Sequence, residues 1–462
     1  MVVKVIAQLK QNNTNLRIFP YHWHVRFPKI LHLLLIYSIV FILGFLVSLY
    51  PYKGNSIGQV LKIKSNELLD IGSASGAKNN LLGFESSRYS FSQFSKFSKI
   101  GSFQVGMSSK GNVYALERNR GDLIYFKSES LDDPIYVGNL FEKLNLEKST
   151  GVSSPPLVMD LHIFGSTLLF SIVIEDAILK CQHLSLYSLE NFPLRELLFP
   201  KIIFQTPCVH DLDNTVMWGG RISSSEESVF LSIGEQRYDR SGFPKKIRIS
   251  RLLKQNVFGS VLKFSKELDS WSVYSSGLRN AQGLFWDSES NQLFEAEHGP
   301  NGGDEVNLLK DGEYFGWPKE TYGKPYPQKY PSGLDEVGQS NNPAIGVDLE
   351  LAKFGLSSGS HENYRSPLFS WSPGVGAGNL IRVPLSSPLK EWRGDILVVH
   401  MGSQKLHRLR LRDGSVVHDE EIELSYRIRD LNLSRNGILI FSTDEGALFS
   451  LSTYDSQVAK SK

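Results

Sequence analysis

Residues 111–126 read GNVYALERNRGDLIYF and hold the pattern that decides the fold. Two short apolar runs, 113–116 and 123–126, are separated by a polar turn that ends at Gly121. Short apolar and aromatic runs bounded by Gly, Asn and Asp are typical of β-strands joined by tight turns. The stretch therefore predicts two adjacent antiparallel strands.

The same form recurs along the chain, at 291–309 and 437–451, and residues 228–233 fit its first half. Few stretches after residue 98 show helical periodicity. In a β-propeller, small antiparallel sheets repeat around a central axis, and this arrangement leaves only short, protected sheet edges. About 355 residues at roughly 40–60 per blade predict six to eight blades, with residues 319–366 as a long insertion between strands. A pair of β-sandwiches is the alternative, but the even spread of the repeat favours one closed ring.

Length and composition exclude several classes of protein. Of the 462 residues, 41% are hydrophobic and 21% are charged, so the chain is neither globally disordered nor a polytopic membrane protein. A formal net charge of only +2 does not indicate a basic surface for binding nucleic acid. The two cysteines, Cys181 and Cys208, exclude a disulfide scaffold and a four-cysteine zinc site.

A charge-free apolar run, ILHLLLIYSIVFILGFLVSLY, occupies residues 30–50. As a helix it is long enough to cross the ~30 Å hydrocarbon core of a bilayer. A cleaved signal peptide is the alternative, but its apolar region would be only about 7–15 residues long, and Ser48-Leu49-Tyr50 is a poor cleavage site. Residues 1–29 contain basic but no acidic side chains, which predicts a cytoplasmic N-terminus.

These features predict a propeller on the extracytoplasmic (periplasmic) side of a membrane, preceded by a single N-terminal transmembrane helix. The predicted segments are a basic cytoplasmic tail (1–29), a transmembrane anchor (30–50), a Ser-rich stalk (51–98), the propeller (99–454) and a polar tail (455–462). A short strand is expected at 59–64 within the stalk. Such a compartment permits a disulfide between the two cysteines, although spacing alone does not distinguish it from two buried thiols.

The densest polar cluster of the chain lies between residues 277 and 318. Its polar side chains are Arg279, Asn280, Gln282, Glu295, Glu297, His298, Asp304, Glu305 and Asn307. The turn His298-Gly299-Pro300 could present backbone carbonyls to a calcium ion. The alternative is a structural blade corner, in which Asp304 and Glu305 cap backbone amides.

The tetrapeptide Gly302-Gly303-Asp304-Glu305 matches a diguanylate cyclase signature, but its surroundings do not. That signature requires an α/β domain and a following Phe, whereas Val306 follows here among predicted strands. We therefore set this interpretation aside.

Residues 277–318 closely resemble the glucose/sorbosone dehydrogenase family, the soluble aldose dehydrogenases that use pyrroloquinoline quinone (PQQ). Supporting motifs follow in the same order along the chain. They are Gly219-Gly220-Arg221-Ile222, Trp392-Arg393-Gly394-Asp395, Arg427-Ile428-Arg429-Asp430 and Ser442-Thr443-Asp444. The resemblance covers about residues 99–452 and implies a six-bladed β-propeller.

The resemblance also implies a mechanism. A His base takes the proton of the sugar C1 hydroxyl, the C1 hydride passes to the quinone, and calcium and an Arg stabilise the developing charge. Arg279 and Asn280 match the pair that contacts the quinone oxygens, with Arg279 as the catalytic side chain. Arg427 and Arg429 match the pair that binds the cofactor carboxylates. Gly299 and Pro300 match the turn whose carbonyls bind calcium.

Three positions depart from the family pattern. Met217 occupies the position of the base His, two residues before Gly219. Ser154-Pro155-Pro156 replaces a Gln-Gly-Gly-type turn, and Gly402 aligns with a cofactor-binding Lys. A thioether cannot act as a base. His210, seven residues upstream, could reach the site from a loop, but a solvated loop His is the favoured interpretation.

Two functions remain open on these residues. The first is a membrane-anchored, outward-facing PQQ-dependent aldose sugar dehydrogenase with an altered site and doubtful activity. The second is a non-catalytic propeller that binds a small sugar, a glycan or a protein partner. Met217 is the residue that separates the two.

Overall fold

The computed structural model describes part of the chain. The described residues are 84–90, 101–127, 131, 134–146, 155–190, 199–209, 217–236, 257–300, 302–323, 361, 363–424 and 426–453. The chain divides into two compact units, residues 1–79 and 80–462, and every described residue belongs to the second unit.

The described residues form six sheets of four antiparallel strands each, and in five of these sheets the strands follow chain order. The first sheet is β2 (Phe103–Met107), β3 (Val113–Glu117), β4 (Asp122–Phe126) and β5 (Ile135–Asn139). The second is β6 (Leu157–Phe164), β7 (Thr167–Asp176), β8 (Cys181–Leu189) and β9 (Lys201–Gln205). The third is β10 (Gly219–Ser224), β11 (Ser228–Ile233), β12 (Ser260–Ser265) and β13 (Trp271–Ser276).

The remaining three sheets complete the set. The fourth is β14 (Ala281–Asp287), β15 (Gln292–Glu297), β16 (Asp304–Leu309) and β17 (Phe369–Trp371). The fifth is β18 (Ala377–Arg382), β19 (Ile396–His400), β20 (Lys405–Arg412) and β21 (Ser415–Glu423). The sixth is β22 (Ile428–Leu433), β23 (Leu439–Thr443), β24 (Ala447–Thr453) and β1 (Phe84–Ser90). A short helix, α4 (Leu140–Lys143), follows β5, and a 3₁₀ turn, η3 (Lys390–Trp392), precedes β19.

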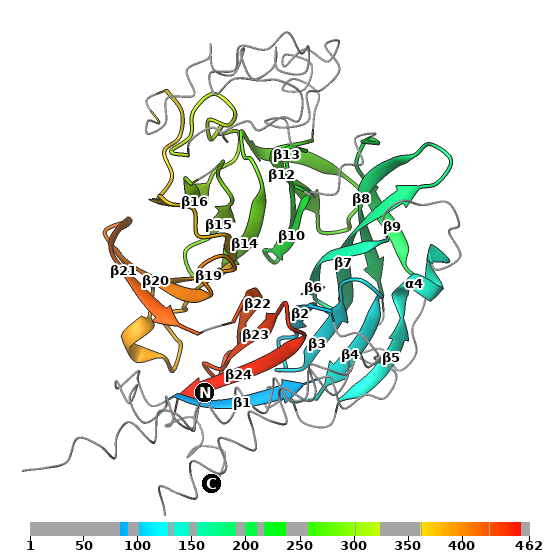
Figure 1. Cartoon of the computed structure of the whole chain (residues 1–462), viewed down its shortest axis with the longest axis horizontal. Helices are drawn as coiled ribbons and strands as arrows, with labels where there is room; N and C mark the ends of the chain where they lie inside the picture. Colours follow the sequence, from blue (N-terminus) through cyan, green and yellow to red (C-terminus); the bar gives the residue numbers. More distant parts are fainter. Residues whose placement is uncertain are drawn as a thin grey trace, which may run out of the picture. The chain divides into compact units, whose positions relative to one another are not determined.

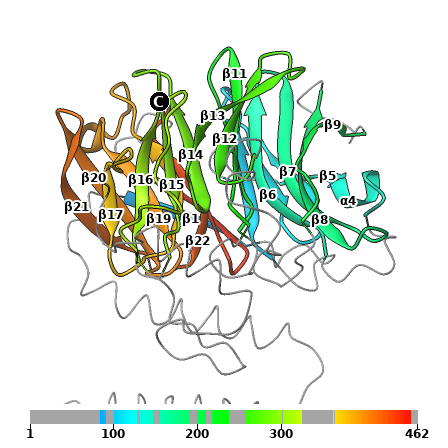
Figure 2. The same ribbon diagram turned by 90° about the horizontal axis from the view of Figure 1, so that it is seen from above.

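The six sheets are the blades of a β-propeller (Figures 1 and 2). The first strand of each blade contacts the first strands of both neighbouring blades, so β2, β6, β10, β14, β18 and β22 surround the centre of the ring. This confirms the predicted six-bladed fold. The strands predicted from the repeat correspond to β3, β4, β11, β15, β16, β23 and β24, and the predicted insertion falls between β16 and β17.

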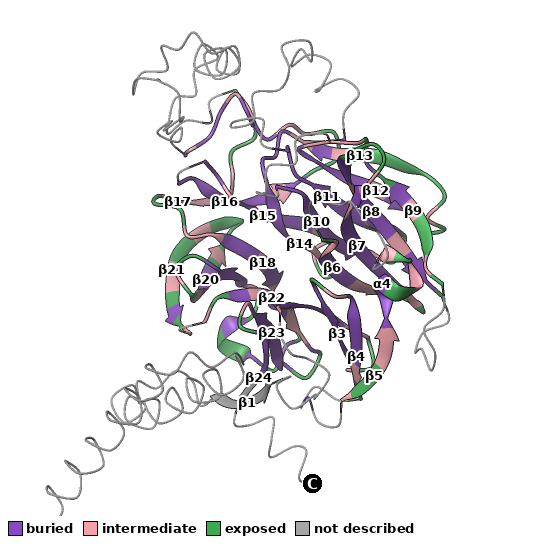
Figure 3. Cartoon of the chain, turned by 45° about the vertical axis from the view of Figure 1, so that its right-hand side comes forward, coloured by how far each residue is buried: buried purple, intermediate pink, exposed green. Residues whose placement is uncertain are grey.

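Strand β11 illustrates why these sequences form blades. Val229, Leu231 and Ile233 pack with residues of the preceding blade, while Phe230 points to the opposite face and packs with residues of the following blade. A blade between two others buries both faces, which is why its central strands are apolar on both sides (Figure 3). Each such side chain contributes roughly 1.5–3 kcal/mol of transfer free energy.

The ring closes through β1, a strand far from its partner in sequence. Residues 84–90 pair in antiparallel register with β24, from Phe84 opposite Thr453 to Ser90 opposite Ala447. In Figure 1 this strand (blue) lies beside β24 (red). It falls within the segment 51–98 that composition predicts to be a stalk, so the propeller includes residues well before the predicted boundary at 99.

The other N-terminal predictions concern residues that the structure does not describe. The predicted transmembrane helix (30–50) and the short strand (59–64) both lie outside the described residues. Among the residues that are described, no helix is long and apolar enough to cross a membrane.

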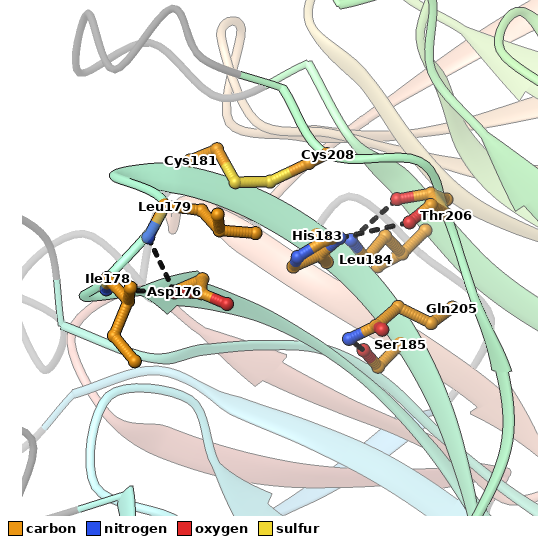
Figure 4. The surroundings of a disulfide bond; sticks show 10 residues. All are labelled: Asp176, Ile178, Leu179, Cys181, His183, Leu184, Ser185, Gln205, Thr206 and Cys208. Carbon is orange, nitrogen blue, oxygen red and sulfur yellow. Dashed lines mark hydrogen bonds between the residues drawn. A yellow bond between two sulfur atoms is a disulfide. The ribbon is translucent and has the colours of Figure 1, made fainter.

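Cys181 and Cys208 form a disulfide that joins the start of β8 to the segment after β9 (Figure 4). Their Cα atoms are 5.6 Å apart, and Gln182 and Val209 form a bridge beside them. His183 Nδ1 lies 3.0 Å from the Thr206 carbonyl oxygen. Because a carbonyl oxygen can only accept a hydrogen bond, Nδ1 is the donor. The two alternatives for the cysteines are thus resolved in favour of the disulfide.

Candidate functional site at the end of the central channel

A buried guanidinium, that of Arg221 on β10, ties the inner strands together at the centre of the ring. Its acceptors come from four other inner strands. They are Gln104 Oε1 of β2 (2.8 Å), Asp160 Oδ1 of β6 (3.1 Å), the Gln282 carbonyl of β14 (2.7 Å), and Asp430 Oδ1 (3.2 Å) and the Arg429 carbonyl (2.9 Å) of β22. Four inner strands besides β10 therefore meet at this hub.

The hub requires a close approach of β10 to β6. Gly220 has φ +86°, and a Cβ at this position would lie 2.5 Å from the Cβ of Met159. Only glycine adopts this conformation and leaves this space without strain. The Gly219-Gly220-Arg221 motif therefore serves to place the guanidinium at the centre.

Arg279 and Asn280 lie just before β14, at the same end of the channel as the Arg221 motif. Their backbone amides both donate to Glu297 Oε2, at 2.5 and 3.2 Å. Burial and, after it, the neighbouring charge of Glu305 raise the pKa of Glu297 to about 8, against the lowering effect of these amides. Glu297 thus positions the backbone that carries both predicted site residues.

The side chain of Arg279 is buried and held from two sides. Its Nη1 donates to the carbonyls of His298 (2.7 Å) and Gly299 (3.0 Å), and its guanidinium lies over the ring of Trp317. Its Nη2 lies 3.8 Å from the sulfur of Met217. Met217 is only 7% exposed, and it lies beside Arg279, as the motif spacing predicts.

Arg427 and Arg429 share a single counter-ion. Arg427 Nε donates to Asp444 Oδ2 (2.6 Å), and Arg429 donates through Nε to Oδ1 (2.8 Å) and through Nη2 to Oδ2 (2.7 Å). Burial alone would raise the pKa of Asp444, but the hydrogen bonds and charges of the two guanidinium groups lower it. Two cations against one carboxylate leave a positive surplus at this position.

His298 links the two pairs of predicted residues. Burial lowers its pKa, the Asp304 carboxylate opposes that shift, and the positive charges of Arg279 and Arg429 lower it further. Both guanidinium groups therefore act on one imidazole, although about 150 residues separate them in sequence. Arg279 and Asn280 directly precede β14, and Arg427 directly precedes β22, so these residues lie at the starts of two inner strands.

Sequence reasoning missed Arg118, which follows β3. This side chain is buried, and its Nε donates to the Val158 carbonyl at 2.9 Å. Its pKa is lowered to about 9, first by burial and then by the positive charges of Arg429 and Arg221. No signal in the local pattern could have found it, because Glu117-Arg118-Asn119-Arg120 reads as an ordinary polar turn.

Asp304 braces the turn that was predicted to bind calcium. Its carboxylate accepts from the amides of Gly299 (3.0 Å), Val375 (3.0 Å), Gly376 (2.6 Å) and Ala377 (3.1 Å). Asp304 therefore caps backbone amides at a blade corner, which is the alternative interpretation of this residue given above.

The predicted calcium donors do not fit the ion in this arrangement. The Gly299 carbonyl accepts from the Arg279 guanidinium, which would repel a cation, and the Pro300 carbonyl packs against Gly323, where a Cβ would lie 2.2 Å from it. Calcium requires about six to eight oxygen ligands, and Asp304 is already bound to four amides. Among the described residues, one group has metal-ligand spacing, Cys181, His183 and Cys208, and its two sulfurs form the disulfide.

The residues at this end of the channel do fit a polycarboxylate quinone such as PQQ. Arg118 and Arg279 each act electrostatically on groups that Arg429 also affects, and Arg427 and Arg429 share Asp444. Planar guanidinium groups pair with carboxylates through two parallel hydrogen bonds. The donor set is therefore suited to an anion with several carboxylates.

Comparisons with known proteins agree with this fold. The family model described as "Glucose / Sorbosone dehydrogenase" matches residues 194–450. Aldose sugar dehydrogenase YliI of Escherichia coli is 27% identical over 239 residues, which cover 50% of this chain and 58% of that protein. Quinoprotein glucose dehydrogenase B of Acinetobacter calcoaceticus is 35% identical over 72 residues, 15% of each chain. The chain thus matches less than two thirds of the length of these curated relatives.

A solved structure extends the likeness to the whole propeller. The soluble aldose sugar dehydrogenase of Escherichia coli, in its apo-form, superposes with a TM-score of 0.57 over 80% of this chain and 99% of that one. At 16% sequence identity, this similarity concerns the fold.

Proposed function

Because this chain belongs to the glucose/sorbosone dehydrogenase family, we propose that it binds PQQ at the end of the channel where Arg279, Arg427 and Arg429 meet. We propose further that it acts on aldose sugars as a dehydrogenase whose turnover is limited by Met217. The observation that carries the proposal is the positive surplus of this site, where two guanidinium groups share Asp444.

The residues of the site have separate roles in this proposal. PQQ, when bound, supplies the hydride acceptor for oxidation at the sugar C1 carbon. Arg427 and Arg429 hold carboxylates, since planar guanidinium groups bind them in pairs of hydrogen bonds. Arg279 is fixed by the carbonyls of His298 and Gly299, so its charge is oriented before any ligand arrives. Asn280, whose Oδ1 accepts from Gln282 Nε2 at 3.0 Å, would help to hold the quinone.

Met217 determines how well such a site works. A thioether cannot accept the proton of the C1 hydroxyl, and the loss of a positioned base typically costs ~10²–10⁴-fold in rate. His210, the substitute considered from the sequence, lies outside the described residues. We therefore propose slow oxidation of aldoses, or none.

A second candidate is a propeller that binds a sugar, a glycan or a protein partner without chemistry. Met217 favours this candidate. Its buried thioether contacts Arg279 at the position where the family resemblance places a base, and a thioether cannot accept a proton there. The two candidates differ in whether sugar reduces bound PQQ.

We also propose that residues 30–50 anchor the protein in a membrane, with residues 1–29 in the cytoplasm and the propeller outside it. The charge-free run and its basic flank support this orientation. The disulfide supports it as well, because disulfides persist in oxidising compartments. A reporter enzyme that is active only after export, fused behind Lys462, should be active; activity of a cytoplasmic reporter at the same position would reverse the orientation.

The experiment that tests the cofactor proposal is a titration of the full chain, in mild detergent, with PQQ. Binding should change the absorbance of PQQ and raise the melting temperature, with calcium and with a chelator compared in parallel. Arg429→Gln should weaken binding by about 10- to 100-fold, because it removes a charge-assisted pair. Arg410→Gln, which removes an exposed charge from β20, is the matched control and should bind normally. Equal affinities of wild type and Arg429→Gln would exclude this site.

A further inference from the structure

The backbone around Gly402 leaves no space for the Lys that the family resemblance places there. A Cβ at this position would lie 2.7 Å from the Val375 carbonyl oxygen and 3.1 Å from its carbon. The two segments are held together by hydrogen bonds from Gly402 N to the Val375 carbonyl (2.9 Å) and from Met401 N to the Gly376 carbonyl (2.8 Å). A cation that replaces this Lys must therefore come from another part of the propeller.

Arg118 approaches the same end of the channel from the first blade. Its backbone amide donates to the Ser102 carbonyl at 3.0 Å, and its Nε donates to the Val158 carbonyl of β6. The terminal nitrogens have poor acceptors: Nη1 lies 3.5 Å from Ser102 Oγ, and Nη2 lies 3.9 Å from the sulfur of Met159. Hydrogen bonds at such distances are weak, so both amino groups retain donor capacity.

Charges of both signs among the described residues act on Arg118. Its strongest charged neighbours are Arg429 and Arg221, and they oppose the attraction of Asp444 and Glu117. Asp444 already accepts from Arg427 and Arg429. Asp160 and Asp430 are bonded to Arg221. Among the described residues, the terminal nitrogens of this nine-tenths buried guanidinium have only weak acceptors, so an anionic ligand that accepted from them would be stabilised.

We infer that Arg118 is a third guanidinium that binds a carboxylate of the quinone cofactor, in the place of the Lys side chain that position 402 lacks. This inference rests on the proposed function, because it concerns the same anionic ligand. It assigns to the first blade a contact that otherwise would come from the fifth. The competing explanation is that Arg118 only holds β6 in place through the Val158 carbonyl.

The test measures PQQ affinity of the full chain by absorbance and tryptophan fluorescence. Arg118→Gln should weaken PQQ binding by about 10- to 100-fold, the scale of a charge-assisted hydrogen-bonded contact. Arg120→Gln removes the same charge from the same turn, where Arg120 faces Glu117 and Asp122, and should leave the affinity unchanged. The trimethyl ester of PQQ provides a second readout, because Arg118→Gln should reduce the preference for the free acid over the ester. A purely structural role would weaken the binding of both ligands equally.

The outcomes separate this inference from the proposed function. If wild type binds PQQ and Arg118→Gln binds it equally well, the role of Arg118 is refuted and the proposed function stands. If wild type does not bind PQQ, both are refuted. If Arg118→Gln does not fold, Arg118→Lys is measured instead; it retains the charge but not the planar fork, and affinity should fall by about tenfold. Unchanged affinity of a folded Arg118→Lys would likewise contradict the inference.

Discussion

The substitution Met217→His tests whether the lost base is what limits this protein. The sulfur of Met217 lies 3.8 Å from Arg279 Nη2, so an imidazole here would stand beside the guanidinium that is proposed to face the quinone. Low exposure (7%) and the adjacent positive charge both favour the neutral imidazole, which is the form that accepts a proton at pH 7. The expected gain in the rate of aldose oxidation is ~10²-fold, the lower end of the range for a positioned base. Burial of a polar ring should cost about 1–3 kcal/mol of stability.

The assay follows reduction of an artificial electron acceptor with excess PQQ, so that a weakened cofactor site does not limit the rate. Met217→Leu is the matched control, because it changes the buried side chain without adding a base. It should leave the rate at the wild-type level. Robust wild-type turnover that persists in His210→Ala would refute the argument that a base is missing. A Met217→His protein that binds PQQ but remains inactive would favour the non-catalytic propeller.

Four further predictions concern stability. Arg221→Met should lower the free energy of unfolding by about 3–5 kcal/mol in urea, because it leaves buried carboxylates without their cation; a loss below about 1 kcal/mol would contradict the role of the hub. Glu297 has a pKa of about 8 in the folded protein against an ordinary value of 4.5, so the folded state binds the extra proton and stability should fall as pH rises from about 4.5 through about 8. Glu297→Gln should flatten this dependence in urea midpoints measured across the range, and an unchanged slope would assign it to other groups. Replacement of Cys181 and Cys208 by Ser should lower the free energy of unfolding by about 3–4 kcal/mol, because the disulfide closes a loop of 27 residues. Equal melting temperatures with and without reductant, measured by calorimetry, would contradict this prediction. Gly220→Ala should cost about 1–3 kcal/mol because of its positive φ and the nearby Met159 side chain, and a neutral result would mean that β10 and β6 can separate at no cost.

The blades could be predicted from the sequence because their information is local. In β11, successive residues Val229, Phe230 and Leu231 alternate between two apolar interfaces, and similar runs recur at turn-bounded intervals. Closure of the ring could not be predicted in the same way. Residues 84–90 read FESSRYS and resemble a polar stalk, and their strand forms by pairing with β24, more than 350 residues later.

The residues of the candidate site could also be predicted only in part. Arg279, Asn280, Arg427 and Arg429 could be named from motifs that resemble those of the family, and the same resemblance implies that Met217 stands at the position of the base. The partners of these residues could not, because Asp444 serves both arginines of β22 and Asp304 binds amides about 70 residues away. Those contacts depend on which strand ends the ring brings together.

By itself, the sequence determined the strand-rich propeller, its repeat, and the order of the motifs, since each depends on residues close together in the chain. Only the tertiary structure decided the disulfide, the closing strand β1, the hub around Arg221 and the position of Arg118. It also decided that the Gly299 carbonyl accepts from Arg279 and that the Pro300 carbonyl lies close to Gly323. The physical reason is that a channel is made by the inner strands of all six blades. Charges from distant segments compete there for the same few counter-ions, and no local pattern records that competition.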